Sequence, residues 1–318
     1  MPENKMKDDF KKMISNKATT YLGNVTKIFL AKRKRPKNLS QYSAIPTFKG
    51  VIENNNLWAT HWAFLNDAKE LTKGIETAKQ IIADMKQLKN PESRTLCLKI
   101  LEKFVKGLTQ KEIFSIINVY VLCFSERKDN LNMWRGYGDG YNSIVIDYKT
   151  ADFEMDEKNT GIFLIGKINY NEDEQKKMML MYLTQYCELL EFICQKFPSQ
   201  KENAVKYMLG YFIVGTVVLS LFMKEKYWSE EKEWRFIFLN PNDDLLDFRA
   251  TDKGFVPFIK VPIFKHNAIQ SINKVRLPKS QNFELREHAM KMLWEKYCNK
   301  NNIQKDLEIE QSSISIVY

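Results

Sequence analysis

The sequence predicts an α+β fold in which a mixed or antiparallel sheet is interrupted by a helical insertion. Three observations lead to this prediction. Short runs rich in β-branched and aromatic residues occur in both halves of the 318-residue chain. Segments whose apolar residues lie three and four positions apart, a spacing typical of amphipathic helices, separate these runs. The two kinds of segment do not alternate strictly, which argues against a doubly wound parallel sheet.

The first 38 residues are expected to form a basic helical arm. Residues 1–37 hold eleven Lys or Arg and three acidic residues, so they carry most of the net charge of +10. Apolar residues recur at helical spacing as far as Leu30, and Pro36 ends the pattern. A cationic segment can bind phosphate backbones, or it can simply be solvated. We therefore keep two interpretations, a nucleic-acid contact through residues 27–37 and a solvated helix.

Residues 39–299 are predicted to form one α+β domain. Because β-branched and aromatic residues favour extended backbone, strands are expected at residues 57–60, 118–125, 143–148, 161–168, 234–239, 255–261 and 272–277. Helical spacing of apolar residues predicts helices at residues 48–52, 67–89, 93–118 and 282–299. The helical insertion spans residues 173–226 and contains two long apolar helices separated near Pro198. Residues 300–318 lack a periodic pattern and are expected to be a flexible tail.

One stretch of the insertion is apolar enough to raise the question of a membrane. Tyr207 to Met223 contains seventeen uncharged residues, whereas a helix that spans a bilayer needs about 20. Gly210, Gly215 and Ser220 dilute its apolar character further. We expect a helix buried in a protein core, which could also serve as the face of a homo-oligomer, and no contact with a membrane.

Cysteine usage and the N-terminus indicate a cytoplasmic location. The five cysteines are widely spaced and contain no CxxC pair, which argues against a disulfide framework or a zinc site and for a reducing compartment. No apolar stretch follows the N-terminal Met-Pro-Glu-Asn-Lys, so no signal peptide is expected.

Three segments place charged and polar residues beside aromatic ones at predicted strand ends, where loops commonly carry function. The first runs from Gln41-Tyr42-Ser43 through Leu57-Trp58-Ala59-Thr60 to Asn66-Asp67 and Glu70. The second joins Cys123-Phe124-Ser125-Glu126 to Met133-Trp134-Arg135-Gly136-Tyr137-Gly138-Asp139-Gly140. The third is Trp228-Ser229-Glu230-Glu231-Lys232-Glu233-Trp234-Arg235-Phe236.

Several enzyme classes lack their sequence signature. The chain contains no GxGxxG, P-loop, HExxH or GxSxG pattern, so dinucleotide binding on a Rossmann fold, Walker-type hydrolysis, zincin proteolysis and α/β-hydrolase chemistry lose support. Its three histidines are far apart in the sequence, which makes histidine-based acid–base or metal chemistry an unfavourable interpretation. His61 alone lies beside one of the three segments, either as a functional group or as a loop residue.

The three segments, in this order, resemble the bacterial family called domain of unknown function 2971. The likeness extends over most of residues 39–278 and includes Phe248-Arg249 and Pro257-Phe258. The family name implies no activity.

A second likeness, to ADP-ribosyltransferase-like folds, implies chemistry on NAD. Those folds have a His-Tyr-Thr/Ser strand, then a Leu-x-Ala/Ser-Thr strand, and a late glutamate that acts at the ribose. Tyr42 and Ser43 match the first strand, and Gln41 stands where the family has His. The likeness makes Glu233, or else Glu231, the catalytic acid together with Tyr42 and Gln41. Binding of NAD as a substrate would fall to Ser43, Trp58, Thr60, Asn66, Asp67, Arg135, Tyr137 and Arg235.

These residue types suit that reaction. Breaking the bond between nicotinamide and ribose develops positive charge at the sugar, which a carboxylate stabilises. Aromatic rings would stack on nicotinamide or adenine, and an arginine would pair with the pyrophosphate. The leading hypothesis is therefore an ADP-ribosyltransferase-like toxin or phage-defence effector that modifies nucleic acid or protein.

Structural roles stand beside each functional one. Trp58, Trp134 and Trp234 suit core packing, Asn66-Asp67 suits a helix N-cap, and glycines 136, 138 and 140 suit a tight loop. Arg235 would also suit a salt bridge to Glu126 or Glu70.

Two other functions remain open. One is a Mg²⁺-dependent nuclease that uses Asp67, Glu70, Glu126 and Asp139 as oxygen ligands. The other is a non-catalytic module that binds nucleic acid or protein through its aromatic loops.

Overall fold

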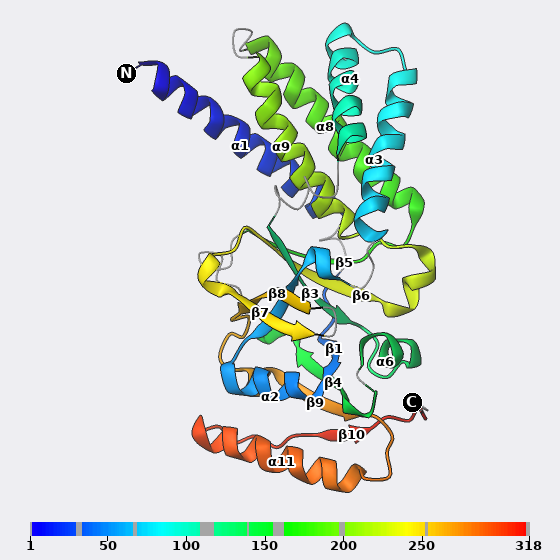
Figure 1. The fold of residues 1–318 in the computed structure, drawn as a ribbon, viewed down its shortest axis with the longest axis vertical. Helices are drawn as coiled ribbons and strands as arrows, with labels where there is room; N and C mark the ends of the chain where they lie inside the picture. Colours follow the sequence, from blue (N-terminus) through cyan, green and yellow to red (C-terminus); the bar gives the residue numbers. More distant parts are fainter. Residues whose placement is uncertain are drawn as a thin grey trace. The chain divides into compact units, whose positions relative to one another are not determined.

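The computed structural model describes residues 2–29, 34–65, 69–108, 118–138, 140–154, 162–196, 201–251 and 254–315 (Figure 1). The chain divides into two units, each assembled from three stretches of sequence. The helical unit combines Met1–Arg33, Leu65–Asn118 and Gly166–Ser229. The sheet unit combines Lys34–Phe64, Val119–Ile165 and Glu230–Tyr318. The division therefore differs from the predicted arm followed by a single domain over residues 39–299.

Ten strands form one sheet in the described part of the chain. They are β1 (Asn38–Ala44), β2 (Leu57–His61), β3 (Val119–Ser125), β4 (Ser143–Lys149), β5 (Ile162–Lys167), β6 (Glu233–Leu239), β7 (Leu246–Thr251), β8 (Gly254–Val261), β9 (Ile272–Leu277) and β10 (Ile309–Gln311). The order is β10-β9-β4-β1-β3-β2-β8-β7, and β6 pairs with both β3 and β5. The strand pairs whose register is described are antiparallel, except for β9 with β10. The predicted α+β class with a mixed sheet is confirmed.

Strand β3 is the hub of the sheet because three strands pair with it. Strand β6 follows one edge of β3 over its whole length, from Val119 opposite Leu239 to Ser125 opposite Glu233. The other edge is shared, since β1 pairs at Ser125 and β2 pairs from Tyr120. Three other strands, from separate stretches of the sequence, therefore meet around β3.

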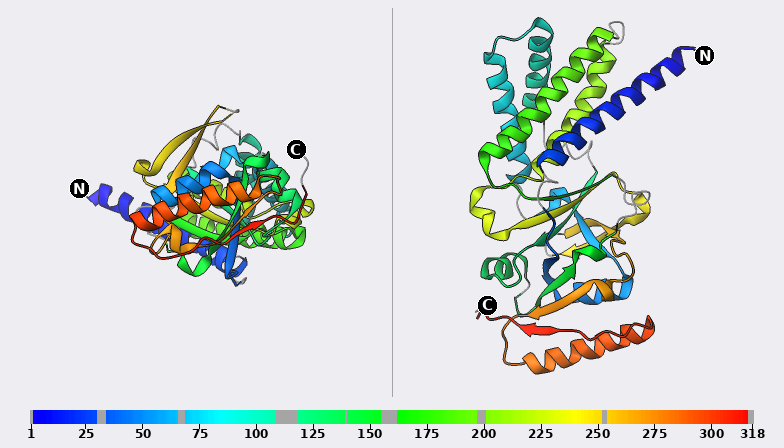
Figure 2. Two further views of the ribbon diagram at one scale, coloured as in Figure 1. Left: turned by 90° about the horizontal axis from the view of Figure 1, so that it is seen from below. Right: turned by 180° about the vertical axis from the view of Figure 1, so that it is seen from behind.

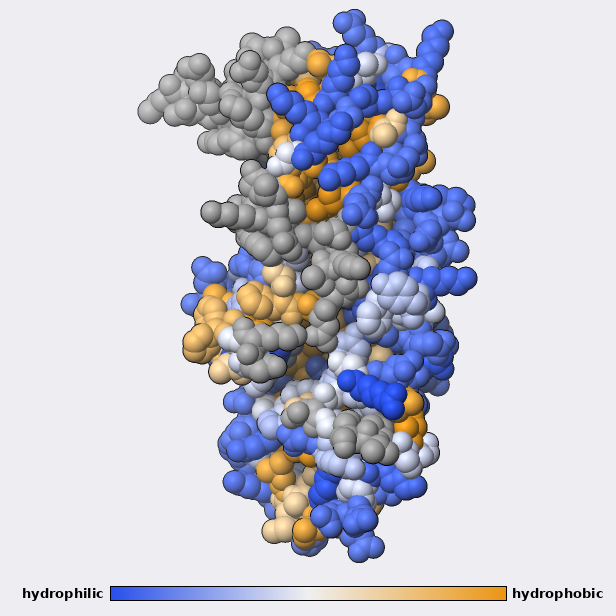
Figure 3. Space-filling model, turned by 45° about the vertical axis from the view of Figure 1, so that its right-hand side comes forward, coloured by the Kyte–Doolittle hydropathy of each residue, from blue (hydrophilic) through white to orange (hydrophobic). Residues whose placement is uncertain are grey.

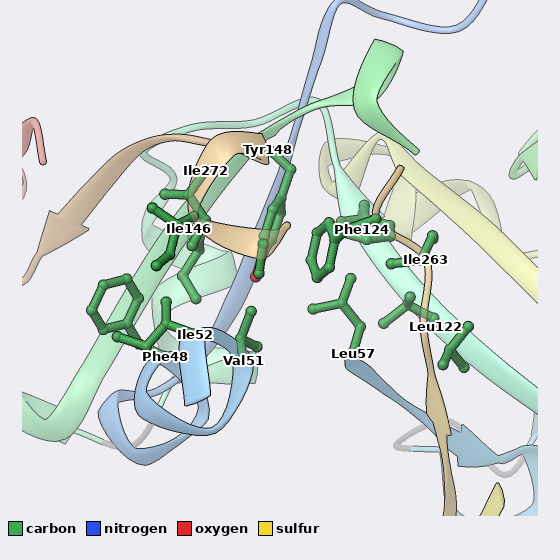
Figure 4. Close-up of a cluster of buried hydrophobic side chains, with 14 of the residues drawn as sticks. Phe48, Val51, Ile52, Leu57, Leu122, Phe124, Ile146, Tyr148, Ile263 and Ile272 are labelled. Atoms are coloured by element: carbon green, nitrogen blue, oxygen red, sulfur yellow. The ribbon is translucent and has the colours of Figure 1, made fainter. Parts of the chain in front are cut away.

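One face of the sheet is apolar and lies under helices α2 (Ile45–Asn54) and α11 (Phe283–Lys300). Side chains of α2, among them Phe48 and Val51, point toward Ile146 and Tyr148 of β4 (Figure 4). Phe48 also stacks on Trp294 of α11, with ring centroids 6.2 Å apart. These rings belong to one buried cluster that unites both helices with the sheet.

The C-terminal segment extends the sheet, in contrast to the predicted flexible tail. Strand β10 pairs in parallel with β9, from Ile309 opposite Val275 to Gln311 opposite Leu277. Two parallel strands need a crossover connection, and α11 supplies it, as the two ribbon views show (Figures 1 and 2). The sequence did not reveal this strand because three residues are too short for a periodic pattern.

In its described residues, the helical unit contains five long helices: α1 (Pro2–Phe29), α3 (Lys69–Gln87), α4 (Glu92–Gly107), α8 (Glu172–Lys196) and α9 (Lys201–Ser220). Their buried side chains form a core of their own. Helix α1, the predicted basic arm, contributes Ile14 and Val25 to this core and contacts α8 and α9. The N-terminal segment is thus a packed helix of the unit. Of residues 27–37, the predicted nucleic-acid contact, residues 30–33 with Lys32 and Arg33 lie outside the described part of the chain.

Most predicted elements are present, and further ones besides β10 were missed. The predicted helices of the insertion correspond to α8 and α9, and the predicted strand at residues 272–277 is β9. Strand β7 and the short helices α6 (Leu131–Tyr137) and α10 (Ala268–Ser271) were not predicted. Helix α6 occupies part of the segment that was interpreted as a glycine-rich loop, and Asn130 caps it by accepting a hydrogen bond from the Met133 N–H.

Close packing explains two of the glycines. A Cβ atom on Gly215 of α9 would lie 2.1 Å from the hydroxyl oxygen of the buried Tyr182 on α8. Gly74 of α3 approaches Ser220 of α9 in the same way. Helix α9 therefore contacts its neighbours at backbone distance through positions where only glycine fits.

The predicted absence of a membrane-spanning helix agrees with the structure. Within the described residues, no helix combines the length and the apolar character needed to cross a bilayer. Met208, Phe212 and Leu219 of α9 instead belong to the helical core. On the molecular face drawn in Figure 3, hydrophilic side chains predominate and apolar ones emerge in separate patches. No disulfide joins any of the five cysteines.

We expect Gly215→Ala to destabilise the protein by about 1–3 kcal/mol, because the added methyl group overpacks the contact with Tyr182. Gly210→Ala on the same helix is the matched control. A Cβ there meets no atom within 4 Å, so we expect a gain of about 0.5–1 kcal/mol from helix propensity. Urea unfolding followed by circular dichroism measures both changes, and equal effects would contradict this account of the helix contact.

Candidate functional site

A row of polar side chains crosses the face of the sheet opposite the apolar core. The strand register places Lys274, Asp147, Ser40, Ser125 and Glu233 side by side on β9, β4, β1, β3 and β6. Residues paired across neighbouring strands project from the same face. Four members of the row, all except Lys274, are buried. Buried polar groups need hydrogen-bond or ionic partners, so the row marks where the sheet can accommodate buried charged side chains.

Glu233 and Arg235 form a buried ion pair at the β6 end of the row. Their side chains lie on the same face because they are two residues apart in the strand. Arg235 Nε donates to Glu233 Oε1 at 2.7 Å, and a second guanidinium nitrogen donates to Oε2 at 3.1 Å. Glu233 is 5% exposed and Arg235 is 1% exposed. A guanidinium in this bidentate geometry stabilises the ionised carboxylate and fixes its orientation.

Glu231 is a second buried carboxylate beside the start of β6. It ends the short helix η5 (Lys226–Glu231), and its Oε1 accepts a hydrogen bond of 2.6 Å from the hydroxyl of Tyr137. Ser125 Oγ donates to its backbone carbonyl at 2.6 Å. Lys232, between the two glutamates, has a left-handed φ of 43°. This turn allows Glu231 and Glu233 both to be buried although they belong to different elements.

The two carboxylates therefore have different partners. Among the contacts that are described, Glu233 pairs with the Arg235 guanidinium and Glu231 accepts a hydrogen bond from the Tyr137 phenol. Different environments are the means by which a pair of carboxylates takes on different roles in acid–base chemistry. Glu126 and Glu230 lie nearby in the structure but have other contacts, Glu126 with the Trp234 indole and Glu230 with Arg127.

The first sequence motif does not join this carboxylate pair. Gln41 lies on the apolar face of the sheet, where its side-chain oxygen accepts from the Tyr148 hydroxyl at 3.3 Å. Tyr42 lies on the opposite face and packs edge-on against Trp134 of α6, with centroids 5.4 Å apart. Burial raises the pKa of Tyr42, so its phenol is a poor acid. Ser43 donates to Thr47 at 2.7 Å.

The remaining predicted NAD contacts are distributed over the sheet unit. Trp58 packs on Phe258, and Thr60 accepts a hydrogen bond from Arg249. Arg135 is exposed on α6. Among the predicted site residues that the structure describes, Tyr137 pairs with Glu231 and Arg235 pairs with Glu233.

Part of the predicted metal site lies outside the description. Asp67 and Asp139 fall outside the described residues, as do the side chain of Glu70 and the predicted NAD contact Asn66. Among the side chains that are described, no group of three or more His, Cys, Asp or Glu could hold a metal ion. The Glu126 carboxylate, also a predicted ligand, accepts from Trp234 Nε1 at 2.8 Å.

The sequence did not single out the other end of the polar row. Asp147 is buried in β4, where it accepts from Ser40 Oγ at 2.6 Å and from Arg276 at 2.7 Å. Arg276 also pairs with Glu310 of β10, at 2.9 Å. One signal was available, because Asp147 is the single charged residue within the apolar run Ser143–Tyr148. A charge within a buried strand indicates an internal partner.

Comparison with known proteins gives a match to a family model. Residues 133–236 match the family model described as a protein of unknown function (DUF2971), which confirms the predicted resemblance over that segment. The matched segment begins within α6 and ends in β6, so it contains Tyr137 and both glutamates and omits the first motif. No curated protein matches the chain. No solved structure matches it either.

Asp147→Asn is expected to lower the free energy of unfolding by about 3–5 kcal/mol, because it leaves the Arg276 guanidinium buried without its closest counter-charge. Glu310→Gln removes the exposed partner of the same arginine and should cost only about 0–1 kcal/mol. Denaturant titration of the two variants provides the measurement. A loss of stability as large for Glu310→Gln as for Asp147→Asn would show that the buried ion pair contributes no more to stability than the exposed one.

His61 should make stability depend on pH. Its ring lies among Trp62, Phe64 and Tyr120, and burial lowers its pKa from 6.5 to about 4. As the pH falls from 6.5 toward 4, His61 binds a proton in the unfolded chain but not in the folded protein. The free energy of unfolding therefore decreases across this window. Below about pH 4 both states bind the proton, and His61 adds no further dependence.

The variant His61→Phe, which keeps the ring contacts, is expected to flatten the decline in stability between pH 6.5 and pH 4 relative to the wild type. His288→Gln, at an exposed position, serves as the control. The experiment compares melting temperatures at a series of pH values. Parallel curves for wild type and His61→Phe would show that the folded protein does not exclude the proton.

Proposed function

We propose that this protein cleaves the nicotinamide–ribose bond of NAD and transfers the ADP-ribosyl group, with Glu231 and Glu233 as its central residues. The observation that carries the proposal is the pair of buried carboxylates with unlike partners, one held by Arg235 and one by Tyr137. The likeness of the segment order to ADP-ribosyltransferase-like folds adds support.

Each carboxylate suits one part of the reaction. When the bond between ribose C1′ and the nicotinamide nitrogen breaks, nicotinamide leaves with the electron pair and positive charge develops at the sugar. Glu233, oriented by Arg235, stabilises that charge. Glu231 accepts the proton of the attacking hydroxyl or amine as the new bond to C1′ forms. Tyr137 orients Glu231 through its hydrogen bond.

The first motif has a supporting place in this proposal. Tyr42 packs against Trp134 of α6, the helix that also carries Tyr137. Tyr42 thus acts on the position of Tyr137 through packing. Gln41 faces the apolar core with Tyr148. Neither residue is assigned a contact with NAD.

The acceptor in this proposal is nucleic acid or protein. The net charge of +10 favours a polyanionic partner. Modification of such a target would make the chain a toxin or phage-defence effector. Growth arrest on expression, relieved by the Glu233→Gln substitution, tests this part of the proposal. A Mg²⁺-dependent nuclease has no support from the described side chains.

We expect purified protein to bind NAD and release nicotinamide, and Glu233→Gln to reduce the rate by about 10²–10⁴-fold with binding retained. The control is Glu230→Gln, whose carboxylate is exposed and paired with Arg127, and which should leave the rate unchanged. Calorimetry measures binding, and chromatography measures nicotinamide. Because Glu233→Gln disrupts a buried ion pair, its fold is checked by circular dichroism.

Tyr137→Phe is the second variant, since it removes only a hydroxyl. It should lower the rate and change its pH profile, because Glu231 loses its hydrogen bond. If the wild-type protein neither binds nor consumes NAD, the proposal is wrong. Equal rates in the wild type and a folded Glu233→Gln would remove the role of this carboxylate.

A further inference from the structure

The sheet unit contains a cavity of about 880 Å³ at a place that is distinct from the carboxylate pair. It lies where the first residue of α2, the short helix η2 (Gly140–Asn142), the connection between β9 and α11, and strand β10 come together. Its lining consists of Ile45, Tyr141, Asn142, Lys279, Ser280, Gln281, Asn282, Arg286, Gln311 and Ser315.

Hydrogen bonds between these segments hold the cavity walls in place. Arg286 of α11 donates to the backbone carbonyl of Tyr141 at 2.6 Å, which ties the helix to η2. The Gln311 side chain donates to the carbonyl of Ser280 at 3.1 Å, which ties β10 to the connection before α11. The walls are therefore built before any ligand arrives, and a preformed site loses little entropy on binding.

The described lining is cationic and rich in hydrogen-bonding groups. Lys279 and Arg286 both line the cavity, and none of its described lining residues is acidic. Arg286 is half-buried, and this partial burial lowers the pKa of its guanidinium, which would therefore gain from a counter-charge. The lining thus favours an anion over a cation or a neutral apolar molecule.

Ser280 provides an independent sign of a ligand. Its hydroxyl oxygen is buried, and no atom of the described structure makes a hydrogen bond to it. Buried polar atoms without partners are rare because each one costs free energy. Ser280 lines the cavity between Lys279 and the start of α11, and rotation of its side chain about χ1 would turn the buried hydroxyl toward an anionic oxygen in the cavity.

We propose that this cavity binds a phosphate-bearing small molecule of nucleotide size. Two cationic side chains match the charge of a phosphate ester or a pyrophosphate. The volume lies within the range of about 300–1,000 Å³ that small-molecule sites occupy, and it is larger than a free phosphate requires. Tyr141, which is 52% exposed, offers a ring for a base, and the neighbouring amides offer donors and acceptors to a sugar. The inference does not depend on the carboxylate pair.

The test is calorimetric titration of the full-length protein with ADP, adenosine and inorganic phosphate. ADP should bind, adenosine should bind at least about tenfold more weakly, and added salt should weaken ADP binding because charge attraction contributes. Inorganic phosphate should compete with ADP at a higher concentration.

Three variants locate the site. Lys279→Gln changes an exposed residue and should weaken ADP binding by about tenfold without affecting the fold. Ser280→Ala should also weaken binding, yet leave stability equal or higher, because it removes an oxygen that has no partner in the free protein. Lys291→Gln, on α11 and paired with Glu287, is the control and should bind like the wild type.

Several results would overturn the proposal. They are the absence of saturable ADP binding at millimolar concentration, equal affinity for ADP and adenosine, and unchanged binding by both Lys279→Gln and Ser280→Ala. Phosphate that binds as tightly as ADP would overturn the assignment of nucleotide size. Loss of ADP binding in Glu231→Gln, with Lys279→Gln unaffected, would move the ligand to the carboxylate pair and would leave the proposed NAD chemistry standing.

Discussion

The pairing of β3 with β6 is the constraint on which the candidate site depends. The register runs without a break from Val119 opposite Leu239 to Ser125 opposite Glu233. Because side chains alternate between the two faces of a strand, a slip of one residue would turn Glu233 and Arg235 into the apolar core and Trp234 out of it. The buried phenylalanines and tryptophan of the apolar face thus fix where the charges lie. Packing of the apolar face therefore fixes the strand register, and the register places the Glu233–Arg235 ion pair on the opposite face.

The sheet unit separates two kinds of chemistry on its two faces. The apolar face has helices α2 and α11 and a continuous core of rings. The opposite face carries buried ion pairs, Glu233 with Arg235 at one end and Asp147 with Arg276 at the other. Buried charges are costly unless each one has a partner, so loss of one partner would destabilise the strands that carry the row. Rigid strands are the support that a reactive carboxylate requires.

The carboxylate pair and the cationic cavity differ in how their buried polar groups are satisfied. At the carboxylate pair, each buried group has an internal partner, and reactivity would come from the difference between the partners. At the cavity, Ser280 lacks a partner and two cations face the same space, so a ligand would complete the site. The matched family segment contains Glu231, Glu233 and one side of the cavity, the part around Tyr141.

The sequence by itself determined the α+β class, most strands, the long helices and the third motif, because apolar periodicity and β-branched runs are local signals. It did not reveal β10 or the helix α6, since three and seven residues are too short for periodicity to show. Nor could it predict which of the neighbours Gln41 and Tyr42 faces the apolar core, or that Glu231 and Glu233 are both buried across a left-handed Lys232. Only the tertiary structure decided which charges became partners, because register and packing, which act between residues far apart in the chain, choose the neighbours of every buried group.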